Sequence, residues 1–314
     1  MKLLIITQKV DRNDPVLGFF HRWLEEFAKH FEKVTVICLE KGEFDLPENI
    51  KVFSLGKEEK NFQFSIFNFQ KIRYTLRFYK YLWTLRGDYD AVFVHMNQEY
   101  VLLGWKLWKL WGKKIYLWRN HAKGSLWTRL AVLLSRKVFY TSPQSFTARF
   151  RKSVQMPAGI DTDFFKPDPT ITRKPNSVLF LGRISPVKKV LEFIEWLKTT
   201  SYVATIAGPI LAEDRAYGDM VKNALNEHIA YVGPVDQAGA LRLYQTHEIY
   251  VNMTSAGSLD KTILEAAACG MKLKIENPHL KELEGKTGEE ARDFMIKHHR
   301  LSLLVDKLAQ ILNV

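Results

Sequence analysis

One segment in the second half of the chain combines cationic side chains with the start of a helix. It begins with Gly182 and Arg183 after an apolar run and reaches Lys188 five residues later. Between them, Ser185 followed by Pro186 is typical of a helix N-cap and first turn. Backbone N–H groups, a guanidinium and an ammonium would then meet at one helix start, an arrangement that favours a diphosphate. A solvated basic turn is the alternative interpretation.

A second segment carries a carboxylate and another ammonium on one short helix. It follows an apolar strand that ends near Asn252, has Ser258 at the N-cap position, and ends at Gly270. Lys261 and Glu265 stand four residues apart on this helix. They belong either to a binding site or to a plain surface ion pair worth about 0.3 to 0.5 kcal/mol.

Together, these two segments resemble the retaining glycosyltransferases with the GT-B fold, the group 1 family. In that family a Gly-Arg-x-x-x-x-Lys segment supplies an arginine and a lysine to the donor diphosphate, which matches Gly182, Arg183 and Lys188. A helix with Leu-Glu-Ala-x-Ala-x-Gly supplies the glutamate that binds the ribose hydroxyls, which matches Glu265 and Gly270. The sequence match extends over residues 156–270. Before residue 156, only the expected order of strands and helices agrees with the family.

The chain departs from the family pattern at one position. The family often has a first glutamate eight residues before the second, near the transferred sugar, and Gly257 stands there in this chain. The Gly-Ser-x-Asp-Lys sequence found here is similar to a variant of the family. By that resemblance, the amides of Gly257, Ser258 and Asp260, together with Lys261, take over part of the donor contact.

Two residues of the first half complete the expected site. Gly18, in a loop before a helix, resembles the family's glycine loop beneath the donor and acceptor, although a plain turn is the alternative. His121 follows a strand at a place where the family often has a histidine that contacts the sugar. His95, at the end of the preceding strand, is the rival candidate, and a structural histidine is the alternative for either.

The resemblance implies transfer of a sugar from a nucleotide-diphosphate donor to an acceptor hydroxyl, with retention at the anomeric carbon. Charge grows on the leaving diphosphate as the glycosidic bond stretches, so the expected catalytic residues are Arg183 and Lys188, with His121. No cofactor and no metal ion is expected beside the donor, and the leaving phosphate is the expected base. The acceptor is expected to be lipid-linked or a polysaccharide.

Two other functions stay open on the sequence alone. A sugar-nucleotide epimerase has the same two-domain architecture, and it would form product without any acceptor. A non-catalytic nucleotide- or RNA-binding protein would account for the basic N-terminal half. The sequence has no recognisable aromatic and basic recognition motif, and its C-terminal half is nearly neutral, so nucleic acid is not an expected partner.

Alternating apolar runs and amphipathic stretches predict an α/β protein with parallel sheets. The expected arrangement is two doubly wound Rossmann-like domains facing a cleft: an acceptor-side domain over 1–165 and a nucleotide-sugar domain over 166–314. No glycine-rich dinucleotide motif or P-loop occurs. The expected strands are 3–7, 34–39, 51–55, 91–95, 115–118, 138–141, 178–181, 203–207, 229–232, 249–252 and 272–275. The expected helices are 19–31, 66–85, 99–111, 126–134, 144–150, 188–198, 213–226, 237–244, 261–269, 288–297 and 301–312.

Charge is distributed unequally between the two halves. Residues 1–150 hold 25 Lys and Arg against 14 Asp and Glu, whereas 151–314 hold 21 against 20. This asymmetry points to an anionic partner for the first half. The two cysteines, Cys38 and Cys269, have no second ligand at metal-binding spacing, so neither a disulfide nor a zinc site is expected.

Residues 60–87 are the expected contact with that partner. They contain six cations and no acid, interleaved with aromatic residues, as in helices that lie on anionic membrane surfaces. Residues 105–111 make a weaker case of the same kind. No apolar run reaches the roughly 18 residues of a membrane span, so a cytoplasmic protein attached at the inner face of the membrane is expected. The alternative is that these aromatic side chains pack against the sheet.

Overall fold

The computed structural model describes residues 1–59, 67–254, 259–278 and 280–313. The chain divides into two compact units, which are Met1–Met156 with Leu304–Val314, and Pro157–Leu303. The first break lies nine residues before the boundary expected at 165/166, because Ile160 and Phe165 pack in the core of unit 2. The C-terminal residues belong to unit 1, where Lys307 Nζ donates a hydrogen bond of 2.8 Å to the carbonyl of Gln155.

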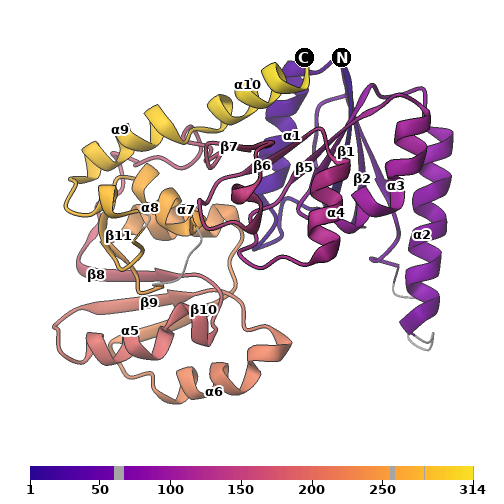
Figure 1. The fold of residues 1–314 in the computed structure, drawn as a ribbon. Helices are drawn as coiled ribbons and strands as arrows, with labels where there is room; N and C mark the ends of the chain where they lie inside the picture. The colour runs from indigo at the N-terminus through magenta and orange to yellow at the C-terminus, as the bar shows by residue number, and fades with distance from the viewer. Residues whose placement is uncertain (60–66, 255–258, 279, 314) are drawn as a thin grey trace. The chain divides into compact units, whose positions relative to one another are not determined.

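Unit 1 is built on a seven-stranded parallel sheet with the order β3-β2-β1-β4-β5-β6-β7 (Figure 1). Its first strand is buried on both faces, as parallel sheets covered by helices require. The order runs outward from β1 to β3 and then resumes at β4 on the other side of β1. The switch point of the sheet therefore lies between β1 and β4. The strands are β1 Lys2–Val10, β2 Lys33–Lys41, β3 Ile50–Ser54, β4 Ala91–His95, β5 Lys114–Trp118, β6 Lys137–Tyr140 and β7 Ser153–Gln155.

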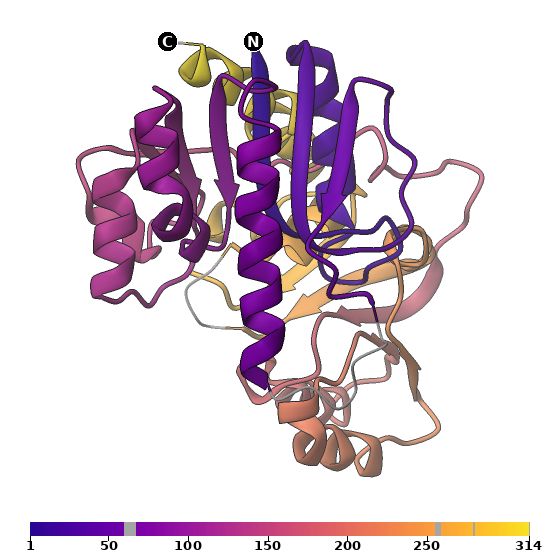
Figure 2. The same cartoon turned by 90° about the vertical axis from the view of Figure 1, so that its right-hand side faces the viewer.

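Helices cover both faces of this sheet. On one face, Trp23 and Phe27 of α1 pack against the rings of Trp118 and Phe93. On the other face, α2, α3 and α4 share a core with the opposite side of β1, β4 and β5, and Figure 2 shows α2 running along that face. The helices are α1 Phe19–His30, α2 Phe67–Thr84, α3 Glu99–Leu110 and α4 Leu126–Leu134, with a 3₁₀ turn at Phe146–Arg149. Helix α10, Leu301–Leu312, begins in unit 2 and ends in unit 1.

Unit 2 is built on a five-stranded parallel sheet with the order β10-β9-β8-β11-β12. Its switch point lies between β8 and β11, where the order reverses. Two apolar cores flank the sheet, one of which contains α5, and the other α7 to α9. The strands are β8 Lys174–Leu181, β9 Val203–Ala207, β10 Ile229–Gly233, β11 His247–Asn252 and β12 Lys272–Ile275. The helices are α5 Val190–Leu197, α6 Arg215–Asn223, α7 Gln237–Thr246, α8 Lys261–Ala268 and α9 Gly288–His298.

Two doubly wound parallel sheets confirm the predicted α/β fold class. Three local differences stand out. The short edge strand β7 was not expected, and the helix expected at 144–150 is a 3₁₀ turn. The helix expected from residue 188 begins at Val190, because Lys189 has left-handed backbone angles (φ 53°) that end the preceding 3₁₀ turn. Within the described ranges, no helix has both the length and the apolar character needed to span a membrane.

Candidate functional site

The switch point of unit 2 gathers the two charged segments at one edge of the sheet. Strands β8 and β11 are neighbours, with Leu179 paired to Tyr250. The loop that holds Gly182 and Lys188 follows β8, and the loop that leads to Asp260 follows β11. Because carboxyl ends of parallel strands at a switch point are the usual place for ligands, both segments lie where a ligand is expected.

Asp260 is the centre of a polar cluster at this edge. The Lys188 ammonium contacts Asp260 Oδ2, and Asn252 Nδ2 donates to the same oxygen at 3.1 Å. Thr262 Oγ1 donates to the other carboxylate oxygen at 3.2 Å. The structure therefore brings together Lys188 and Asp260, both predicted from the sequence, and adds Asn252, which was not predicted as a site residue.

Tyr250 connects the elements that carry this cluster, and it was not predicted as a site residue either. Its hydroxyl oxygen lies 3.0 Å from the Leu181 carbonyl oxygen and 2.7 Å from Thr262 Oγ1, so it joins β8, β11 and α8. Burial raises the pKa of Tyr250 well above its ordinary value. The side chain therefore stays a neutral hydrogen-bonding group at any ordinary pH.

Glu265 and Lys261 are withdrawn from water, which excludes a solvated surface pair. Glu265 is 8% exposed, and the hydroxyl of Tyr244 donates to Glu265 Oε2 at 3.0 Å. The Lys261 ammonium is inaccessible to solvent. Burial raises the pKa of Glu265 and lowers the pKa of Lys261, and the opposite charge of each partner counteracts the shift. Two buried ionisable groups on the first turns of α8 are typical of a functional site.

Arg183 lies apart from the Asp260 cluster. Its side chain is 43% exposed, and Nε lies 3.7 Å from Oδ2 of Asp214. Gly182, the residue before it, is tightly packed by Gly208, whose φ of +142° suits only glycine. A Cβ on Gly208 would lie 1.9 Å from the Gly182 carbonyl oxygen, so the two loops approach as closely as backbones can.

Two buried hydroxyls near the cluster lack a partner among the described residues. These are Ser185 Oγ, in the loop after β8, and Thr254 Oγ1, in the loop after β11. Ser185 stands at the predicted N-cap position, before the 3₁₀ turn Pro186–Lys188, but its side chain makes no capping hydrogen bond and the α-helix begins only at Val190. Buried polar groups are nearly always hydrogen-bonded, so each of these hydroxyls is a candidate contact for a bound ligand. The predicted residues Gly257 and Ser258 lie outside the described residues.

The loop that contains Gly18 follows β1 at the switch point of unit 1. Asp14 Oδ1 accepts hydrogen bonds from the backbone N–H groups of Val16 (2.9 Å) and Leu17 (2.7 Å), and its other oxygen pairs with Lys9 at 2.8 Å. Gly18 has ordinary helical angles, but a Cβ there would lie 2.6 Å from the Asp14 carbonyl oxygen. Glycine is therefore required by the close approach of the backbone. The contacts of Asp14 fix the conformation of the loop.

The two candidate histidines have opposite surroundings. His95 is 2% exposed, stacks on the ring of Phe20 at 4.1 Å, and places Nδ1 3.1 Å from Thr7 Oγ1, so it is a packed structural residue. His121 is exposed, and its Nδ1 lies 3.0 Å from both the backbone nitrogen and the carbonyl oxygen of Lys123. Of the two, only His121 offers an accessible ring.

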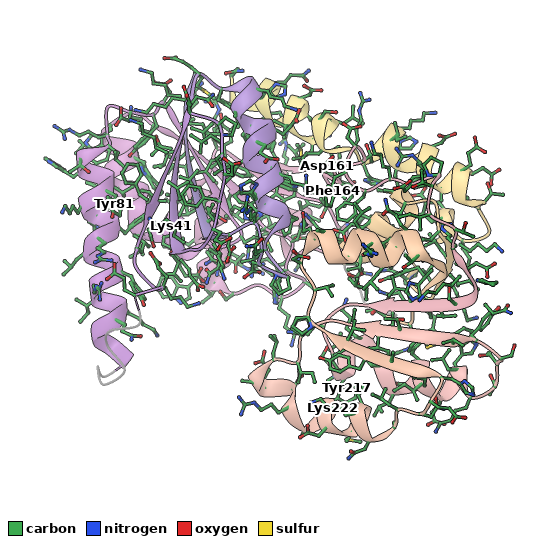
Figure 3. The ribbon with its side chains drawn as sticks, turned by 180° about the vertical axis from the view of Figure 1, so that it is seen from behind. Lys41, Tyr81, Asp161, Phe164, Tyr217 and Lys222 are labelled. Carbon is green, nitrogen blue, oxygen red and sulfur yellow. The ribbon has the colours of Figure 1, made fainter. Side chains whose placement is uncertain are left out.

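Two Asp-x-Asp triplets, 88–90 and 161–163, have paired carboxylates of the kind that can hold a metal ion. In 88–90, both carboxylates accept hydrogen bonds from lysine N–H groups of neighbouring strands. In 161–163, Asp161 Oδ1 accepts from the N–H of Phe164 at 3.0 Å and closes a turn (Figure 3). Among the described residues, no group of three His, Cys, Asp or Glu side chains is placed to hold a metal ion.

Comparisons with known proteins agree with this architecture. No protein-family model and no curated protein matches the chain. Its structure is similar to HepE from Anabaena in complex with UDP and glucose, with a TM-score of 0.75 and 15% identity over 100% of both chains. Sucrose-phosphate synthase from Thermosynechococcus elongatus gives 0.74 at 12% identity, covering 100% of this chain and 98% of that one. WaaG, a glycosyltransferase involved in lipopolysaccharide biosynthesis, gives 0.65 at 13% identity over 99% of each.

Proposed function

Because the chain has the GT-B fold, we propose that it is a retaining, metal-independent glycosyltransferase that uses a nucleotide-diphosphate sugar. The observation that carries this proposal is the polar cluster at the switch point of unit 2. Lys188 and Asp260 meet there, and Ser185 and Thr254 each bring a buried hydroxyl without a partner among the described residues. The first two solved structures compared above are of proteins described with UDP and glucose or as a sucrose-phosphate synthase, which supports a donor of this class.

The donor diphosphate is proposed to lie against Lys188 and Arg183. As the glycosidic bond breaks, negative charge develops on the β-phosphate, and cations fixed beforehand stabilise it most at that stage. The ammonium of Lys188 is held in place by Asp260, and the half-exposed guanidinium of Arg183 lies 3.7 Å from the carboxylate of Asp214. The leaving phosphate is the proposed base for the acceptor hydroxyl.

Glu265 is proposed to accept hydrogen bonds from the ribose hydroxyls. A carboxylate offers about four acceptor positions, and the hydroxyl of Tyr244 occupies one of them. Burial raises the pKa of Glu265, and the neighbouring Lys261 ammonium acts in the opposite direction. In unit 1, the loop at Gly18 and the accessible ring of His121 are proposed to contact the sugar and the acceptor.

The acceptor is proposed to be lipid-linked, with α2 resting on an anionic membrane surface. Four apolar side chains are exposed at intervals of four, three and four residues on this helix: Ile72, Leu76, Tyr79 and Trp83. Lys80 is exposed beside them, and Arg86 lies over the ring of Trp83 at 5.0 Å. Other residues of the predicted membrane-contact segment 60–87 make contacts within unit 1 instead. Phe78 is fully buried, and Arg73 and Arg77 pair with Glu59.

A panel of nucleotide sugars and nucleoside diphosphates tests the donor site by thermal unfolding. A ligand at about 100 times its dissociation constant stabilises the folded protein by about 2.7 kcal/mol, so one base should give a clear rise in Tm. The exposed Lys222→Gln variant of α6 is the control and should show the same rise. If no member of the panel raises the Tm of the parent protein, the donor proposal fails.

A further inference from the structure

A long part of unit 1 contains no acidic residue. Residues 100–156 hold twelve Lys and Arg side chains and not one Asp or Glu. This stretch forms α3, β5, α4, β6 and β7, and the three strands lie together at one end of the sheet. Glu99, the first residue of α3, is the one acid in these elements, and the excess of cations gives this end of unit 1 a strong attraction for anions.

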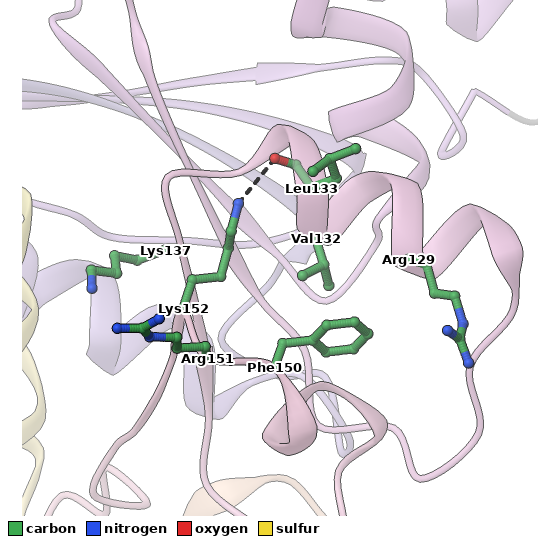
Figure 4. A pocket seen from close by; sticks show the side chains of 7 residues that line it. All are labelled: Arg129, Val132, Leu133, Lys137, Phe150, Arg151 and Lys152. Carbon is green, nitrogen blue, oxygen red and sulfur yellow. Dashed lines mark hydrogen bonds between the residues drawn. The ribbon is translucent and has the colours of Figure 1, made fainter.

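A pocket of about 660 Å³ opens within this stretch. Figure 4 shows its apolar residues at the centre, with Lys137 and Arg151 to one side and Arg129 to the other. Apolar and cationic side chains thus line one cavity. The lining residues are Arg129, Val132, Leu133, Lys137, Phe150, Arg151 and Lys152.

Among the residues that the structure describes, no carboxylate pairs with the cations of the pocket. Lys152 Nζ donates to the carbonyl oxygens of Leu133 (3.0 Å) and Ser135 (2.8 Å) at the end of α4. Burial and the nearby charge of Lys137 both lower the pKa of Lys152. In the described part of the chain, no carboxylate forms an ion pair with Lys137 or Arg151. An anion in the pocket would relieve the repulsion among these side chains.

The outer surface of α4 is apolar where a surface helix is ordinarily polar. Leu126 is 81% exposed, Trp127 65% and Leu133 70%, and Leu130 lies between them on the same side of the helix. Leu133 also lines the pocket, so the apolar stripe and the cationic cavity are continuous. Exposed leucine and tryptophan beside lysine and arginine are the features of a helix that lies in a membrane interface.

We propose that this pocket binds the phosphate of an anionic lipid while the α4 stripe enters the acyl-chain boundary. A free anion would use the cations but would leave the stripe in water, whereas a lipid occupies both. The site is separate from the α2 surface, since α3 packs between α2 and α4. The proposal also goes beyond glycosyl transfer, because lipid binding at this pocket is expected whichever ligand unit 2 binds.

Sedimentation with mixed phosphatidylcholine and phosphatidylglycerol vesicles tests the site on the full chain. Each lysine or arginine near an anionic surface contributes about 1 kcal/mol, so Lys137→Gln with Arg151→Gln should weaken partitioning roughly twenty- to thirtyfold. Trp127→Ser should weaken it roughly tenfold or more, because the ring no longer enters the interface. Matched controls on α6, Lys222→Gln and Met220→Ser, change an exposed cation and an exposed apolar side chain and should have no effect.

Competition with inorganic phosphate distinguishes a lipid phosphate from a free anion as the ligand of the pocket. The proposal predicts that millimolar phosphate at constant ionic strength displaces little protein from the vesicles and that Trp127→Ser stays impaired. Full displacement by phosphate with no effect of Trp127→Ser would show a free-anion site and overturn the lipid assignment. Variants that partition like the α6 controls would overturn it as well. Nucleoside diphosphate binding, measured in parallel, should be unchanged in all variants, so failure of the donor proposal would be seen separately.

Discussion

The Lys188 ammonium contacts the Asp260 carboxylate, although the two residues stand 72 positions apart in the sequence. They meet because their loops follow β8 and β11, which are neighbouring strands. Asp260 is held in turn by the side chains of Asn252 and Thr262. The ammonium proposed to bind the donor phosphate is thus positioned by β11 and α8 and not only by its own loop.

Lys188→Ala and Arg183→Ala should each lower kcat more than they weaken donor binding, because leaving-group charge is greatest in the transition state. Steady-state kinetics combined with a binding titration measure both effects. A rise in KM with unchanged kcat would show that these cations bind the donor in the ground state and add nothing in the transition state.

The same two variants should differ in stability. Arg183 is half-exposed and 3.7 Å from Asp214, so Arg183→Ala should lower the Tm less than Lys188→Ala does. Lys188→Ala leaves the Asp260 carboxylate without its cation and should lower the Tm. Adding Asp260→Asn to Lys188→Ala should restore part of that loss, which a double-mutant cycle detects.

Glu265→Gln should weaken nucleoside diphosphate binding roughly ten- to hundredfold, because a hydrogen bond to a charged group contributes about 1.5 to 3 kcal/mol. Glutamine is tolerated in helices, so α8 should keep its structure. Tyr244→Phe is the control, since it removes one hydrogen bond to Glu265 but keeps the carboxylate, and it should lose less affinity. Calorimetry that finds parental affinity for Glu265→Gln would refute the ribose assignment.

The fold and half of the unit 2 site could be predicted because they depend on local pattern and topology. Apolar runs locate the strands, and the order of a doubly wound sheet brings the loops at Gly182 and Asp260 to one edge. Tyr250 and Gly208 could not be identified, because their roles arise from contacts with backbone atoms far away in the sequence.

The errors have local physical causes. The N-cap expected at Ser185 assumed that a helix follows Pro186 directly, but Lys189 adopts a left-handed conformation and delays it. The alternation of aromatic and basic residues on α2 gave no indication that Phe78 faces the sheet and Trp83 faces solvent. Only burial separates these two roles.

His299 should make the stability of unit 2 depend on pH. Its Nδ1 accepts a hydrogen bond from the N–H of Ala158 at 3.3 Å, and burial lowers the pKa of His299 from 6.5 to about 4. Between those values the unfolded chain binds a proton that the folded chain does not. The free energy of unfolding should therefore fall as pH drops from about 6.5 to about 4, by up to roughly 3 kcal/mol, and change no further through this group below that.

Denaturant unfolding at several pH values measures this effect. His299→Asn retains an acceptor but does not titrate, and its stability should be flatter over the same pH range. The control is His228→Asn, which changes a histidine with a 64% exposed side chain and should keep the parental profile. A parental profile in His299→Asn would show that another group causes the pH dependence.

Leu76→Ser with Trp83→Ser should reduce binding to anionic vesicles if α2 rests on the membrane. Both side chains are exposed, so the fold should be kept. The loss should be roughly tenfold or more, because each apolar side chain that enters the interface contributes about 1.5 to 3 kcal/mol. Partitioning equal to that of Met220→Ser on α6, or equal binding to neutral and anionic vesicles at high salt, would show that α2 serves only the fold.

The most direct test of glycosyl transfer is the configuration of the product formed in the presence of EDTA. The protein is incubated with the nucleotide sugar that raises its Tm most and with a lipid-linked or oligosaccharide acceptor, and the anomeric carbon is followed by NMR. The proposal predicts a glycoside with the donor's anomeric configuration, formed at the same rate with and without the chelator. An inverted product, activity that requires Mg²⁺ or Mn²⁺, or an isomerised nucleotide sugar formed without acceptor would contradict it.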